Sequence, residues 1–93
     1  MVGQRIIRVA VNGYGVIGKR VADAVAVQKD MALAGVADVA QDWRVRAALS
    51  RGYALYGATE EHAVAMGAAG LDVSGTLDDL LEAADIVVDC APK

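Results

Sequence analysis

Three glycines stand between a strand-like run and a helix-like run, and this arrangement constrains the fold more than any other feature of the sequence. Residues 5–11 (RIIRVAV) are rich in β-branched side chains and end at Asn12-Gly13, as a buried strand ending in a tight turn does. From Val16 to about Gln28, apolar residues recur at spacings of three and four, which predicts a helix. A strand, a glycine turn and a helix therefore follow one another directly.

The glycines Gly13, Gly15 and Gly18 fit the pattern G-x-G-x-x-G, which is a weak signal alone and a stronger one between a strand and a helix. The first glycine allows a tight turn, the second lets the backbone approach a pyrophosphate, and the third lets the helix pack closely on the strand. The N–H groups and positive dipole end of the helix then face the anion. The pattern predicts a dinucleotide-binding turn; the alternative is a strand-to-helix connection without a ligand.

An acidic residue follows the next predicted strand, which covers residues 31–37 (MALAGVA). Asp38 lies about 20 residues after Gly18, the spacing at which an acid accepts hydrogen bonds from the ribose hydroxyls of the adenosine. Its charge would repel a 2′-phosphate, so we expect NAD rather than NADP as the cofactor. Two alternatives stay open: Asp38 as a solvated loop acid, and Arg44 or Arg46 as a partner for a 2′-phosphate.

The rest of the sequence continues the alternation of strand and helix. Helices are predicted over residues 43–50 and from Thr76 to Ala84, and a further helix begins at Thr59 and is expected to be broken by Gly67 and Gly70. Strands are predicted over residues 53–56 and 85–90, with a minor extended piece over 71–73. Such alternation implies right-handed crossovers and a mostly parallel sheet covered by helices. The predicted fold is therefore α/β, a truncated Rossmann-like three-layer domain with strand order 3-2-1-4.

The composition fits one small core and excludes several classes of partner. Hydrophobic residues make up 56% of the chain and aromatic residues 4%, so Ala, Val, Leu and Ile must build the interior. A net charge of −3 without a basic run gives no footprint for nucleic acid, and no apolar stretch approaches the roughly 20 residues of a membrane span. With a single cysteine and no secretory signal pattern, we expect a soluble, cytoplasmic single domain over residues 1–93.

The longer string NGYGVIGKRVADAV resembles the N-terminal signature of the archaeal-type (type II) glyceraldehyde-3-phosphate dehydrogenases. The segments RGYALYG (51–57) and GTLDDLLEAADIVVDCAPK (75–93) are similar to the same family, so the resemblance spans nearly the whole chain. It implies the first part of an NAD(P)-binding Rossmann domain. The residues that match the family's nucleotide-binding turn are Asn12, Gly13, Tyr14, Gly15, Val16 and Ile17.

The family resemblance also implies phosphorylating oxidation of glyceraldehyde 3-phosphate by a cysteine nucleophile in a Ser-Cys-Asn context. The sequence contains no such segment, and Cys90, at the end of an apolar strand, is interpreted as a small hydrophobe. We therefore expect no catalytic residue here and no activity from the chain alone. Many family members carry a lysine-containing stretch after the second strand that suits a 2′-phosphate. In this sequence the stretch is replaced by VADVAQDW (36–43), which has no lysine and again favours NAD.

The last predicted strand carries two further expectations. Ala91 and Pro92 follow it and are expected to line the cofactor groove through their backbone, because ligands bind at the carboxyl ends of parallel strands. Asp85 and Asp89 are expected to be structural acids at the two ends of this strand. The strand would also form an apolar edge of the sheet, which predicts self-association into a homo-oligomer.

Two functional hypotheses follow, with a third less favoured. The chain is the cofactor-binding part of a dehydrogenase, or it is a free-standing nucleotide-binding or self-assembling module; in the third, a separate chain completes an active site.

His62 has no nearby catalytic partner in the sequence and is expected to be an exposed helix residue. No pair of ligands has metal-binding spacing, so no metal site is predicted.

Overall fold

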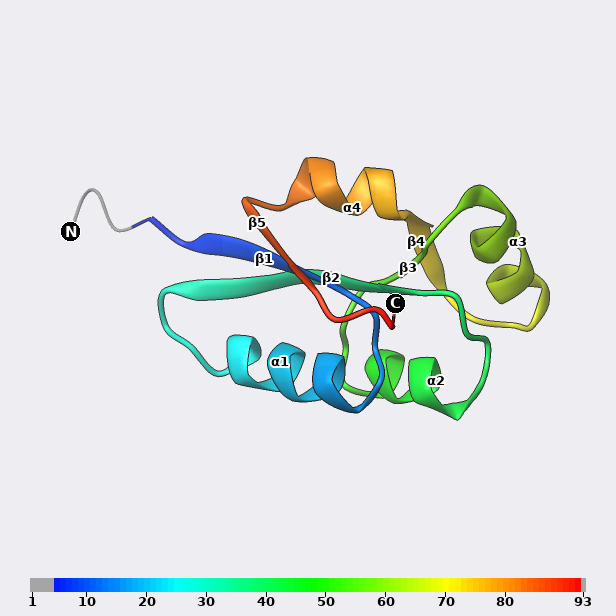
Figure 1. Cartoon of the computed structure of the whole chain (residues 1–93), viewed down its shortest axis with the longest axis horizontal. Helices are drawn as coiled ribbons and strands as arrows, with labels where there is room; N and C mark the ends of the chain where they lie inside the picture. Colours follow the sequence, from blue (N-terminus) through cyan, green and yellow to red (C-terminus); the bar gives the residue numbers. More distant parts are fainter. Residues whose placement is uncertain (1–4, 93) are drawn as a thin grey trace.

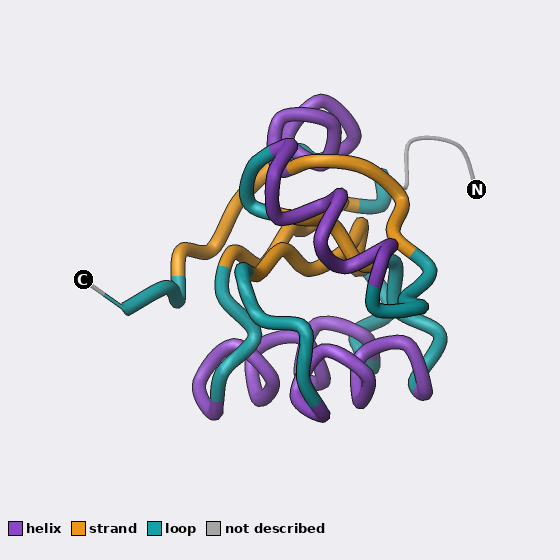
Figure 2. The backbone as a smooth tube through the Cα atoms, turned by 90° about the vertical axis from the view of Figure 1, so that its right-hand side faces the viewer, coloured by secondary structure: helices purple, strands orange, loops and turns teal. Residues whose placement is uncertain are grey.

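A computed structural model describes residues 5–92 of the protein. The elements in chain order are β1 (Ile7–Asn12), α1 (Val16–Ala26), β2 (Met31–Asp38), α2 (Trp43–Ser50), β3 (Leu55–Gly57), α3 (Glu60–Ala68), β4 (Val73–Thr76), α4 (Leu77–Ala83) and β5 (Ile86–Asp89). The strands form one parallel sheet in the order β4-β3-β2-β1-β5. Helices α1 and α2 cover one face of the sheet, and α4 covers the other (Figures 1 and 2).

The predicted α/β class and strand order are confirmed. The strands expected first, second, third and last are β1, β2, β3 and β5, and they lie side by side as β3-β2-β1-β5. The minor piece expected over 71–73 overlaps the observed strand β4 only at Val73, because β4 covers Val73–Thr76. It pairs outside β3 through Val73 opposite Leu55 and Gly75 opposite Tyr56. Its sequence VSGT has little apolar alternation, so only pairing with β3 makes it a strand.

The helix starts follow from local side-chain chemistry. Asp42 caps α2 by accepting a hydrogen bond from the Arg44 amide, and Thr59 caps α3 by accepting one from the His62 amide. Thr76 and Asp79 form the expected capping box at α4. His62 is half-buried, and its Nδ1 lies 2.8 Å from the Thr59 hydroxyl, so its ring supports the cap.

The prediction that Gly67 breaks the third helix is wrong. Helix α3 continues through Gly67 to Ala68, and a Cβ at Gly67 would meet nothing within 4 Å. A glycine inside a helix costs about 1 kcal/mol relative to alanine, which packing of α3 against the sheet outweighs. Gly70, with φ +86°, turns the chain away after the helix end, as expected.

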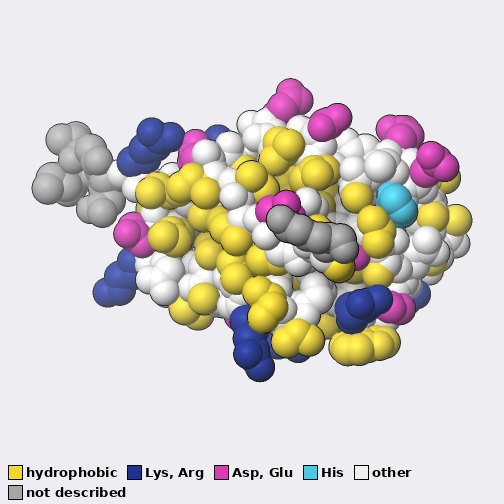
Figure 3. Space-filling model, viewed as in Figure 1, with side chains coloured by type: hydrophobic (Ala, Val, Ile, Leu, Met, Phe, Trp, Pro, Cys, Tyr) yellow, Lys and Arg dark blue, Asp and Glu magenta, His cyan; other side chains and the backbone are white. Residues whose placement is uncertain are grey.

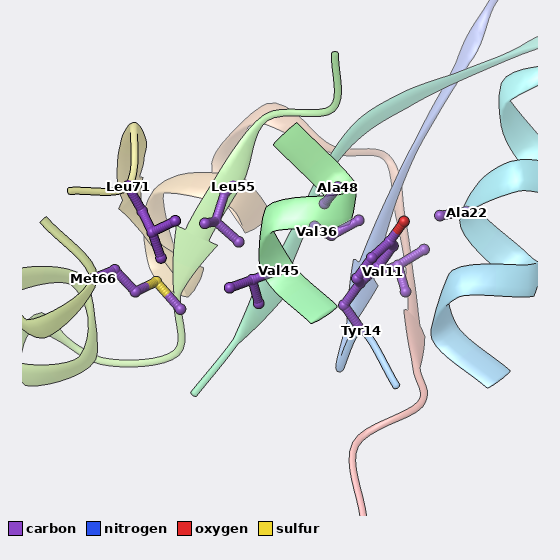
Figure 4. Close-up of a cluster of buried hydrophobic side chains, with 9 residues drawn as sticks. All are labelled: Val11, Tyr14, Ala22, Val36, Val45, Ala48, Leu55, Met66 and Leu71. Carbon is purple, nitrogen blue, oxygen red and sulfur yellow. The ribbon is translucent and has the colours of Figure 1, made fainter. Parts of the chain in front are cut away.

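The core consists of two unequal clusters, one on each face of the sheet. The larger cluster lies between the sheet and helices α1, α2 and α3, and contains Val11, Tyr14, Ala22, Val36, Val45, Ala48, Leu55, Met66 and Leu71 (Figure 4). The fully buried part of the other cluster is only Ala10, Ala37 and Leu80, with Leu80 supplied by α4. Partly buried side chains, among them Tyr56 and Leu77, pack against this cluster, and Leu80 is the one large side chain among its fully buried members in residues 5–92.

Helix α1 is also held by a polar cluster around Asp23. The Tyr53 hydroxyl donates a hydrogen bond of 2.7 Å to Asp23, and the Arg51 guanidinium lies 3.2 Å from the same carboxylate oxygen. Burial, together with this hydrogen bond, raises the pKa of Tyr53 to about 12. These contacts join α1 to the segment between α2 and β3.

Within residues 5–92, no helix has the length and apolar character needed to cross a membrane.

Candidate functional site

The glycine turn connects β1 to α1 at the carboxyl edge of the sheet. Gly13 has φ +97°, a conformation that side chains other than glycine rarely adopt, and a Cβ there would lie 2.7 Å from the backbone of Ala91. Its amide donates a hydrogen bond of 2.7 Å to the Ala37 carbonyl, which fixes the turn against β2. Glycine at this position is therefore required by both the backbone angle and the neighbouring chain.

The other two glycines have opposite surroundings. A Cβ at Gly18 would collide with the carbonyl group of Gly13, so α1 lies directly against the turn. A Cβ at Gly15 would meet nothing within 4 Å, so the space in front of this residue is open. Close packing at the third glycine and open space at the second are the geometry that the G-x-G-x-x-G pattern requires.

The first turn of α1 is free to meet an anion. Gly15 is the N-cap residue and supplies no side-chain hydrogen bond, and no acidic residue lies in the first turn. The leading N–H groups of a helix have no partner within the helix and carry a partial positive charge. Val16 and Ile17, the first two residues of α1, line the cavity in front of the turn. An anionic group in this cavity would meet those N–H groups.

Asp38 holds the turn in place. Its Oδ2 accepts a hydrogen bond of 2.6 Å from the Tyr14 amide, and its Oδ1 accepts from the amides of Val39 and Ala40 at 2.6 and 2.9 Å. A carboxylate has about four acceptor positions, so roughly one remains for a ligand hydroxyl. The sequence located Asp38 at the site but did not reveal these backbone contacts, which make the residue an organiser of the turn.

A cavity of about 620 Å³ opens at the carboxyl edge of the sheet, in front of the turn. Most of the residues predicted for the site line it: Asn12, Gly13, Gly15, Val16, Ile17, Asp38, Ala91 and Pro92. Tyr14 and Gly18 do not line it. Gly18 packs behind the turn, and Tyr14 contributes its amide to Asp38.

The Tyr14 side chain belongs to the core. Its ring is 1% exposed and lies in the larger cluster between α1 and α2 (Figure 4). Its hydroxyl has no hydrogen-bond partner among the described residues, and burial with the nearby charge of Asp23 raises the pKa of this hydroxyl. The tyrosine thus anchors the turn from behind, which the sequence pattern did not indicate.

Several cavity residues were missed by sequence reasoning. They come from the ends of neighbouring strands and the residues that directly follow them: Val39, Ala40, Ala58, Leu77 and Cys90. Ala58 follows β3 and Leu77 follows β4, so the rule that ligands lie at the carboxyl ends of strands could have found them. Cys90 packs against the larger core cluster, as expected of a small hydrophobe, and also reaches the cavity wall.

The acids at the two ends of β5 have structural partners. Asp85 accepts a hydrogen bond of 2.9 Å from the Arg8 amide, which together with the Arg5 guanidinium lowers the pKa of the Asp85 carboxyl. Asp89 accepts from the Asn12 side chain and the Ala91 amide, both at 3.2 Å. Asn12 therefore joins the end of β1 to the segment after β5, which carries Ala91 into the cavity wall.

The structure distinguishes the two arginines proposed from the sequence. Arg44 lines the cavity, whereas the Arg46 guanidinium donates to the Ala69 carbonyl, at the end of α3. Among residues 5–92, no group of three or more His, Cys, Asp and Glu side chains is arranged to hold a metal ion.

A parallel sheet covered by helices on both faces, with a glycine turn between β1 and α1, is the Rossmann-like α/β architecture. The sequence comparisons agree with the resemblance read from the turn. The chain is 54% identical over 88 residues to glyceraldehyde-3-phosphate dehydrogenase of Methanothermobacter thermautotrophicus, and 52% identical over 85 residues to that of Methanothermus fervidus. The enzyme of Halobacterium salinarum is 51% identical over 88 residues.

These three matches cover 91 to 95% of this chain and 25 to 26% of each relative. The chain therefore spans about a quarter of the length of the curated relatives that it matches, and it corresponds to their N-terminal region. The predicted resemblance to archaeal glyceraldehyde-3-phosphate dehydrogenases is confirmed. No family model matches the sequence. A solved structure, an NAD-binding protein from Listeria innocua, aligns with a TM-score of 0.47 and 18% identity, covering 92% of this chain and 35% of that one.

Proposed function

We propose that this chain binds a nicotinamide dinucleotide through its ADP-ribose and pyrophosphate part, as the first portion of the NAD(P)-binding domain of a glyceraldehyde-3-phosphate dehydrogenase-like oxidoreductase. The observation that carries the proposal is the open space in front of Gly15, at an uncapped helix N-terminus. The sequence similarity to archaeal glyceraldehyde-3-phosphate dehydrogenases supports the same function. The chain itself binds the cofactor and supplies no catalytic residue.

Each side of the cavity has a role in this proposal. The amides of Val16 and Ile17 bind the pyrophosphate, with Gly15 leaving room for its approach. Asp38 accepts a ribose hydroxyl with its remaining lone pair and favours NAD over NADP by charge. Gly13, Asn12, Ala91 and Pro92 form the wall beyond the turn. Tyr14 and Gly18 support the turn from the core side.

Calorimetric titration of the folded chain with NAD, NADP and ADP-ribose tests the proposal. We expect saturable binding of NAD, with ADP-ribose keeping most of its affinity because the turn contacts only that half of the cofactor. Absence of binding by all three compounds to a chain with a cooperative unfolding transition would contradict the proposal.

Replacing Asp38 by alanine should lower the ratio of NAD affinity to NADP affinity about tenfold, since a hydrogen bond to a charged group contributes roughly 1.5–3 kcal/mol. Both affinities should also fall, because the Tyr14 amide loses its acceptor. The ratio is therefore the informative quantity. Asp72→Asn, an exposed acid just before β4, is the control and should leave the ratio unchanged. An unaltered ratio in the Asp38 variant would remove this residue from the ribose site.

The alternative function is a self-assembling module, and the observation that favours it is the exposed strand β5. This strand lies at the sheet edge, with Ile86 and Val87 51% and 45% exposed, and hydrophobic side chains gather around it in the space-filling view (Figure 3). Exposed apolar edge strands pair with other chains. We propose that the chain forms a homo-oligomer through this edge.

Sedimentation over a range of protein concentrations measures this association. The wild-type chain should show a mass that rises with concentration, and Val87→Lys should shift it towards the monomer, because lysine blocks edge-to-edge pairing. Val64→Lys is the matched control, because Val64 is an exposed valine on α3. A wild-type chain that stays monomeric at high concentration would contradict self-association.

A further inference from the structure

Arg44 is the one cationic residue among the described residues that line the cavity. It lies in the first turn of α2, and both ends of its guanidinium group contact Asp42. Its Nε donates to Oδ1 at 3.2 Å and its Nη2 donates to Oδ2 at 3.0 Å. The same Asp42 carboxylate caps α2 by accepting from the Arg44 amide at 3.1 Å. The ion pair thus lies at the start of α2, where Arg44 lines the cavity.

The charges of three residues are coupled at this rim. The hydrogen bonds from Arg44 lower the pKa of the Asp42 carboxyl, and Asp42 together with the more distant charge of Asp38 raises the pKa of Arg44. Arg44 and Asp38 line the same cavity, and the proposed function puts the adenosine ribose at Asp38. The negative charge of Asp38 would repel a phosphate on the ribose 2′ position, and the positive charge of Arg44 would attract it.

We propose that Asp42 is a positioning residue that sets the cofactor preference, because it holds Arg44 in an ion pair and withholds it from a 2′-phosphate. NADP must exchange the two side-chain hydrogen bonds between Arg44 and Asp42 for bonds to its own phosphate. NAD carries no 2′-phosphate and leaves the pair intact. This inference deepens the proposed function and rests on it.

The neighbouring cations do not replace Arg44 in this role. Lys19 and Arg20 line an adjoining groove of about 290 Å³ between α1 and α2, and they do not line the cavity in front of the turn. The groove and the cavity share Gly15, Val16 and Arg44. Arg46 is bonded to the Ala69 carbonyl. Among residues 5–92, availability of a cation to the 2′-phosphate therefore depends on whether Asp42 releases Arg44.

Asp42→Asn is the direct test, with the affinities for NAD and NADP measured by calorimetry. Asparagine keeps an oxygen acceptor for the helix cap and removes the charge that holds Arg44. Exposed ion pairs are weak, so NADP affinity should rise about fivefold while NAD affinity stays unchanged. Asp72→Asn makes the same change in net charge, just before β4 and therefore at the amino end of that strand, and should alter neither affinity.

A double-variant comparison separates the positioning role from simple charge repulsion. Arg44→Gln should lower NADP affinity, and adding Asp42→Asn to that variant should then change nothing. If Asp42→Asn raises NADP affinity equally without Arg44, Asp42 acts by direct repulsion and the inference is overturned. Unchanged NADP affinity in the Asp42→Asn variant, with NAD binding intact, also overturns it. Failure of the wild-type chain to bind NAD, NADP and ADP-ribose would overturn the proposed function and this inference together.

Discussion

Replacing Gly15 by valine is expected to abolish dinucleotide binding while leaving the protein folded. Gly15 has φ −85° and ψ −156°, an extended conformation with negative φ, and a Cβ at this position would meet no atom within 4 Å. The new side chain would instead fill the space through which a pyrophosphate reaches the N–H groups of α1. Loss of two hydrogen bonds to a charged group, at about 1.5 kcal/mol or more each, lowers affinity at least about a hundredfold.

Calorimetry with NAD and a urea unfolding curve together measure both parts of this expectation. Gly67→Val is the matched control, because Gly67 also has no atom within 4 Å of its would-be Cβ and lies on α3, away from the cavity. The control should bind NAD with wild-type affinity and should be no less stable than the wild type, because valine has a higher helix propensity than glycine. Wild-type affinity in the Gly15 variant would show that the anion does not lie at this turn.

Replacing Leu80 by alanine should be among the most destabilising single changes in the protein. Leu80 is fully buried and, among the described residues, is the one large side chain of the fully buried cluster that it forms with Ala10 and Ala37. Removal of a buried leucine side chain costs about 2–5 kcal/mol, with the larger values where a cavity remains. Ala10 and Ala37 lie on strands and cannot move in to fill the space. Small domains have stabilities of about 5–15 kcal/mol, so this loss is a large fraction of the total.

Leu81→Ala provides the comparison on the same helix. Leu81 is 42% exposed, so the same substitution one residue later should change the free energy of unfolding by less than about 1 kcal/mol. Urea midpoints for the two variants give the difference directly. Equal midpoints would mean that α4 does not depend on Leu80 for its attachment to the sheet.

Much of the fold could be read from the sequence because its signals are local. The caps at Asp42, Thr59 and Thr76 act on amides within their own helices, so residue type and spacing were sufficient to locate α2, α3 and α4. Gly67 shows where such reasoning fails. A glycine weakens a helix locally, but packing of α3 on the sheet decides whether the helix continues.

The candidate site also has one part that the sequence predicted and another that only the structure revealed. The sequence by itself determined the glycine turn, the helix after it and the position of Asp38, since each follows from spacing along one continuous βαβ segment. Only the tertiary structure decided that Asp38 is bonded to the Tyr14 amide, that Asp42 holds Arg44 at the cavity rim, and that Ala91 lies against Gly13. The contacts of Asp38 and Ala91 join residues distant along the chain, and the place of the Asp42–Arg44 pair depends on how α2 packs. Both are set by strand pairing and side-chain packing, which no local spacing encodes.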